Sequence, residues 1–136
     1  MIMGELAYHQ GAVDDAFEHL RLAVERYDDL NYTEPWSWMH PPRHALGALL
    51  LEQGHRAEAE AVYRTDLGLS SDPNQRAPRG CTHPDNIWSL HGLLECLDDS
   101  ENRHEIQFLR QRLDLAQARA DVEITASCCC RKTTGA

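Results

Sequence analysis

Two residues in the C-terminal third of the chain, His91 and Glu95, stand four positions apart, which places both side chains on one face of a helix. A histidine and a carboxylate at this spacing can ligate zinc or form a buried hydrogen-bonded pair. Arg119, Asp121 or cysteines of the tail could supply further partners. The alternative is a structural polar bridge that ties the last helix down.

Three consecutive cysteines, Cys128 to Cys130, could bind a soft metal ion together with a histidine. Their spacing is not that of a zinc finger, and the sequence contains no Cys-x-x-Cys pair. A free, exposed and oxidisable tail is the alternative, and then no cofactor is expected. If the chain holds a metal, we predict zinc or another soft transition metal. The predicted ligands are His44, His91, Glu95, Cys128 and Cys130.

Motifs for other chemistry are missing from the sequence. There is no nucleophile elbow, phosphate-binding loop or dinucleotide fingerprint. The sequence therefore favours a protein without catalysis of its own, although a fragment of a metal-dependent enzyme remains the alternative.

The overall charge limits the classes of partner. The 136 residues include 13 basic and 22 acidic side chains, for a net charge of −9. An acidic chain without a basic patch argues against binding to nucleic acid or to an anionic membrane surface. No apolar run approaches the roughly 20 residues that span a bilayer. With no secretory signal at the start and an odd number of cysteines, three of them adjacent, we expect a reducing cytoplasm.

The hydrophobic pattern predicts helices only. Two helices fill residues 1–30 and are broken at Gly11, two more lie on either side of Gly54 within 43–68, and a third pair fills 84–120. No segment has a strand period long enough for a sheet. We therefore predict an all-α fold of three antiparallel helix pairs joined by two long loops, forming one domain over 1–121, with an extended cysteine-rich tail over 122–136. In the first loop, Trp36 and Trp38 are expected to cap the core or the seam between pairs, a binding platform being the alternative.

Small residues recur with one spacing in the first two pairs. Gly4, Gly11 and Ala16 in the first pair correspond to Gly47, Gly54 and Ala59 in the second, seven and then five positions apart. The first glycine of each set should let a neighbouring helix approach closely, the second should form the turn, and the alanine should lie where the helices touch.

This pattern resembles the tetratricopeptide repeat, most closely at Leu46-Gly47, Gly54, Ala59 and Tyr63. Trp88 and Gly92 match the start of a third, degenerate copy whose turn is Asp98-Asp99-Ser100. The intervals of 43 and 45 residues between Gly4, Gly47 and Gly92 exceed the family's period of about 34. The chain is also similar to the C-terminal end of larger bacterial and fungal tetratricopeptide-type proteins of unassigned function, in the stretches 35–39, 43–52 and 128–130.

The resemblance implies a stacked α-solenoid that acts as a protein–protein interaction scaffold. The first helix of each pair would line a concave groove for a peptide or protein segment. Carried over by position, the groove residues are Glu5, Tyr8, His9, His44, Ala48, Leu51, Glu52, Asn86, Ser89, Leu93 and Cys96. The family's lysine-containing clamp for a chaperone's terminal carboxylate is absent, because no lysine precedes Lys132.

Only three residues precede Gly4, so the first helix should lack N-terminal turns that the repeat pattern would give it. Apolar surface left exposed there could be covered by another copy of the chain. Three hypotheses therefore stand: an interaction scaffold, a metal-binding protein, and a self-associating one.

Overall fold

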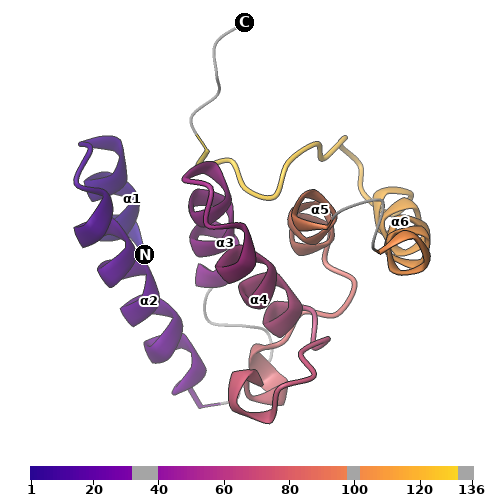
Figure 1. Ribbon diagram of the computed structural model, residues 1–136, viewed down its shortest axis with the longest axis horizontal. Coiled ribbons are helices and arrows are strands. Elements are labelled where there is room, and N and C mark those ends of the chain that lie inside the picture. Colours follow the sequence, from indigo (N-terminus) through magenta and orange to yellow (C-terminus); the bar gives the residue numbers. More distant parts are fainter. Residues whose placement is uncertain (32–39, 98–101, 132–136) are drawn as a thin grey trace, which may run out of the picture.

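The computed structural model describes residues 1–31, 40–97 and 102–131, and these residues form helices and connecting segments without a strand. The described residues form six α-helices, which are labelled in Figure 1, and two short 3₁₀ turns in the connection between α4 and α5. Their bounds are α1 Ile2–His9, α2 Val13–Asp28, α3 Pro42–Glu52, α4 Arg56–Asp66, η1 Pro73–Gln75, η2 Arg79–Cys81, α5 Ile87–Cys96 and α6 Arg103–Gln117. The all-α prediction is confirmed for this part of the chain. The predictions for Trp36, Trp38 and the turn at 98–100 fall outside it.

Each helix packs against the next one along the chain, and α3 also contacts α5. In Figure 1 the two N-terminal helices lie on one side, α3 and α4 in the middle, and α5 and α6 on the other side. One apolar core runs through all six helices, from Tyr8 and Leu20 to Leu93 and Leu109. In the described residues, no helix is both long and apolar enough to cross a membrane.

The predicted turn glycines end the first helices of two pairs. Gly11 and Gly54 have φ of +87° and +81°, a left-handed conformation that glycine adopts without steric cost. After each of them the chain closes the helix end, with Ala12 N–H donating to Ala7 O (2.9 Å) and His55 N–H donating to Leu50 O (2.9 Å). The prediction that these glycines form turns is confirmed.

The close helix contacts predicted at Gly4 and Gly47 also occur, and a further one occurs at Gly92 in the third pair. A β-carbon placed on Gly4 would lie 2.7 Å from Leu20 Cγ. The ring of Tyr63 on α4 crowds two glycines at once: a β-carbon would lie 2.7 Å from it at Gly47 and 2.1 Å from it at Gly92. Tyr63 therefore fills the seam where α4 meets both α3 and α5.

The C-terminal segment differs from the free tail that the sequence suggested. Cys128 and Cys130 are buried in the core and joined by a disulfide, and only Cys129 of the three is exposed. Their α-carbons lie 5.3 Å apart because the chain turns at this point, which places the two sulfurs on the same side. A soft-metal site built on free tail thiolates is not present in this state.

Candidate functional site

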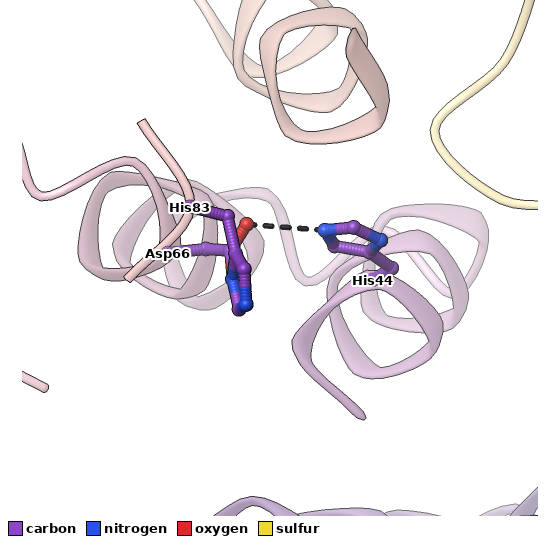
Figure 2. A group of neighbouring side chains, drawn as sticks. All are labelled: His44, Asp66 and His83. Atoms are coloured by element: carbon purple, nitrogen blue, oxygen red, sulfur yellow. Dashed lines mark hydrogen bonds and ion pairs between the residues drawn. The ribbon is translucent and has the colours of Figure 1, made fainter. Parts of the chain in front are cut away.

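The most completely buried acidic group of the described chain is the carboxylate of Asp66, the last residue of α4. It accepts four side-chain hydrogen bonds. Oδ1 accepts from His83 Nδ1 (2.8 Å), and Oδ2 accepts from His44 Nε2 (3.1 Å), Asn86 Nδ2 (2.8 Å) and Ser89 Oγ (2.6 Å). Figure 2 shows the two imidazoles approaching this carboxylate from different parts of the fold.

The start of α5 and the loop before it bring three of these donors to Asp66. Asn86 is the N-cap of α5, and its Oδ1 accepts from the backbone N–H of Ser89 (2.8 Å). The backbone N–H of His83 also donates to the carbonyl oxygen of Asp66 (2.6 Å). The end of α4 and the beginning of α5 are therefore connected by both backbone and side chains.

Two further helices complete the cluster. His44 lies in the first turn of α3, and its ring stacks on Trp88 with a centroid separation of 6.1 Å and an interplanar angle of 21°. Tyr27, near the end of α2, places its hydroxyl 3.1 Å from His83 Nε2. In the tautomer whose Nδ1–H donates to Asp66, Nε2 accepts from the Tyr27 hydroxyl.

The electrostatics of Asp66 reflect two opposing effects. Burial raises the pKa of its carboxyl group, but the hydrogen bonds from His44 and His83 outweigh burial and hold the pKa well below its usual range. Asp66 is therefore an ionised carboxylate with no exposed surface. His44, Asp66 and His83 each offer one ligand atom, and these atoms lie within 4.8 Å of one another.

The metal ligands predicted from the sequence are not brought together. In the described part of the chain the one group of three candidate ligands is His44, Asp66 and His83, so only His44 of the predicted set takes part. His91 and Glu95 do share a helix face, but both contact the C-terminal segment. His91 Nε2 donates to the carbonyl oxygen of Ile124 (2.7 Å), and Glu95 forms an ion pair with Arg131 (2.7 Å).

Asp66 and His83 were missed by the sequence analysis. A signal for Asp66 was present, because an acidic residue at the C-terminus of a helix faces the negative end of the helix dipole and needs compensating donors. His83 carried no such signal, since its position depends on the course of the loop that precedes α5.

The predicted groove residues divide into buried and accessible ones. Tyr8, His44 and Ser89 are buried, so a ligand on the surface does not reach them, and the same holds for Ala48, Leu93 and Cys96. Glu5, Leu51, Glu52 and Asn86 are half-buried, and His9 is exposed. The residues that remain available are mainly acidic or polar.

The C-terminal segment 124–131 contacts α5 through His91 and Glu95 and places Arg131 near Glu52 of the predicted groove set. In Figure 1 the chain leaves α6, crosses the end of α5 and reaches α3. Ser127 is fully buried beside the hydroxyl of Tyr63. The hydrogen bonds to Glu95 raise the pKa of the Arg131 guanidinium, with a further contribution from the charge of Glu52 on α3.

Comparison with known proteins finds no matching family model, no matching curated protein and no matching solved structure.

Proposed function

We propose that this chain is a protein-interaction module of tetratricopeptide-like helix pairs, which binds an extended segment of a partner protein across α3 and α5. One observation carries the proposal: the chain's own residues 124–131 lie on this surface. A surface that accommodates one extended segment through backbone, small-residue and charge contacts suits other segments of the same chemistry.

The contacts of the C-terminal segment define the partner sequence that this surface would select. His91 donates to a backbone carbonyl, the seam at Tyr63 admits a small side chain such as Ser127, and Glu95 pairs with a basic side chain. The expected partner segment therefore has a small residue followed by a basic residue four positions later. Glu52 adds a second carboxylate near the basic residue, and the net charge of −9 also favours a basic partner.

The helix packing supports the tetratricopeptide-like part of the proposal. Glycines at corresponding positions of α1, α3 and α5 are each in close contact with the second helix of a pair. Every helix packs on its successor, and the first helices α3 and α5 also touch. Such an arrangement presents the first helices on a common surface, which is where these modules bind.

A peptide-binding experiment tests the proposal. We expect a chain that ends at residue 123 to bind a fluorescent peptide of residues 122–131, with its cysteine pair oxidised, as measured by anisotropy. Glu95→Arg should abolish binding, and an Arg131→Glu peptide should restore it to that variant. His104→Ala, on α6 away from these contacts, is the matched control. A shortened chain that retains its helical circular dichroism but does not bind the peptide would contradict the proposal.

We infer self-association as a second candidate function, because α1 exposes several large apolar side chains. Ile2, Met3 and Leu6 are 77%, 61% and 48% exposed. Their burial against a second copy would remove this surface from water. Light scattering over a range of concentrations tests the inference: an increase in mass that Met3→Lys suppresses is expected, whereas a constant monomer mass would exclude it.

A further inference from the structure

We propose that His44, Asp66 and His83 form a binding site for one divalent first-row transition metal ion, zinc being the expected ion. The site is independent of the peptide-binding surface, and its residues come from α3, the end of α4 and the loop before α5. Two imidazoles and one carboxylate are a ligand set that suits zinc and its neighbours in the first transition row.

The three candidate ligand atoms lie close together, although not yet at the spacing of a bound ion. Asp66 Oδ2 lies 3.1 Å from His44 Nε2, and Asp66 Oδ1 lies 2.8 Å from His83 Nδ1. Ligands bind zinc at about 2.0–2.2 Å, so two atoms of a tetrahedral site lie about 3.3 Å apart. The two distances to Asp66 run to different oxygens of its carboxylate, and the three ligand atoms lie within 4.8 Å of one another. The side chains would therefore shift by up to about 1.5 Å to surround one ion.

The surrounding hydrogen bonds would orient all three ligands. Asn86 and Ser89 hold Oδ2 of the Asp66 carboxylate, and Tyr27 meets the far nitrogen of His83. Such contacts fix the rotamer and tautomer of a ligand and strengthen its binding. The stacking of Trp88 on His44 restricts the ring orientation of the third ligand.

Metal binding does not require the imidazoles of His44 and His83 to release a proton. Both imidazoles donate to Asp66 in the metal-free state, so each carries a proton on the nitrogen that faces the carboxylate. A ring that binds the metal through this nitrogen carries its proton on the other nitrogen. For His83 that nitrogen is Nε2, which then donates to the oxygen of Tyr27.

An approach to the site exists on its Tyr27 side. A pocket of ≈ 520 Å³ is lined in part by Tyr27, His40 and Pro42. Tyr27 contacts His83 directly, and the ring of His40 lies 5.9 Å from that of His44. An ion in the pocket is therefore separated from His83 by the side chain of Tyr27, and from His44 by the side chain of His40.

The test uses the full-length, tag-free chain after removal of bound metal with a chelator. We expect Zn²⁺ to bind with one ion per chain and to raise the melting temperature, and Co²⁺ to give a visible spectrum typical of nitrogen and oxygen ligands. Asp66→Asn, His44→Ala and His83→Ala should each weaken Zn²⁺ binding at least 100-fold. His91→Ala should bind as the parent does, because His91 contacts the C-terminal segment instead.

Two further variants keep the proposal testable if a ligand variant fails to fold. Tyr27→Phe removes only a hydroxyl and should weaken binding by about 10–100-fold, as expected for a contact behind a metal ligand. A chain with Cys128, Cys129 and Cys130 all changed to Ser should bind as tightly as the parent. Three outcomes would overturn the proposal: a parent melting temperature that Zn²⁺ leaves unchanged, Zn²⁺ binding that Tyr27→Phe leaves intact, or binding that disappears in the serine variant.

Discussion

The ring of Tyr63 occupies the space that a side chain at Gly92 would need. A β-carbon at position 92 would lie 2.1 Å from Tyr63 Cζ, far inside van der Waals contact, and Tyr63 is itself fully buried. Because the same ring also crowds Gly47, it cannot move toward α3 to make room. The contact between α4 and α5 therefore depends on the absence of a side chain at Gly92.

Gly92→Ala should lower the free energy of unfolding. Alanine is favoured over glycine in a helix by up to about 1 kcal/mol, but overpacking of a core costs about 1–3 kcal/mol and should dominate here. Urea unfolding measures the difference. In a chain that carries Tyr63→Leu, Gly92→Ala should lower the free energy of unfolding by less, because leucine leaves space for the added methyl group. A Gly92→Ala variant as stable as the parent would contradict the close packing.

The glycine framework could be predicted from the sequence because its causes are local. Gly54 forms its turn through its own backbone freedom, and Gly47 is followed, just beyond that turn, by the tyrosine that packs on it. The Asp66 cluster could not be predicted in this way. His44 and His83 are 39 positions apart and reach the same carboxylate only because the 67–86 connection returns to the end of α4.

The thiols should differ in reactivity toward a disulfide reagent at neutral pH. Burial raises the pKa of Cys96 to about 12 and also raises the pKa of Cys81, so neither forms much thiolate. Cys129 is exposed. We expect one rapidly reacting thiol in the folded chain and three after unfolding without reductant. Cys129→Ser should remove the rapid phase. Equally rapid reaction of Cys96 would contradict its burial.

The free energy of unfolding should fall in acid, partly because the carboxylate of Glu105 becomes protonated. Hydrogen bonds from Arg64 outweigh the effect of burial and lower the pKa of this carboxyl group. Its stabilising contribution is therefore complete above the pKa of the unfolded chain and is lost as the pH falls through the lower pKa of the folded one. Denaturant unfolding at several pH values should show that Glu105→Gln destabilises the chain near neutrality and loses this effect in strong acid. A difference that does not depend on pH would contradict the ion pair.

Asp66→Ala should be among the most destabilising single changes in the chain. It removes the acceptor for four side-chain donors, three of which, His44, His83 and Ser89, are buried and lose that partner. Removal of one side of a buried charged network costs about 3–5 kcal/mol. Glu58→Ala is the matched control, because Glu58 pairs with Arg21 at the surface and such pairs contribute at most about 1 kcal/mol. Both variants can be compared by urea unfolding in metal-free buffer, where the loss reports the hydrogen-bonded cluster alone. If Asp66→Ala proved no more costly than Glu58→Ala, the four hydrogen bonds would not be contributing to the stability of the fold.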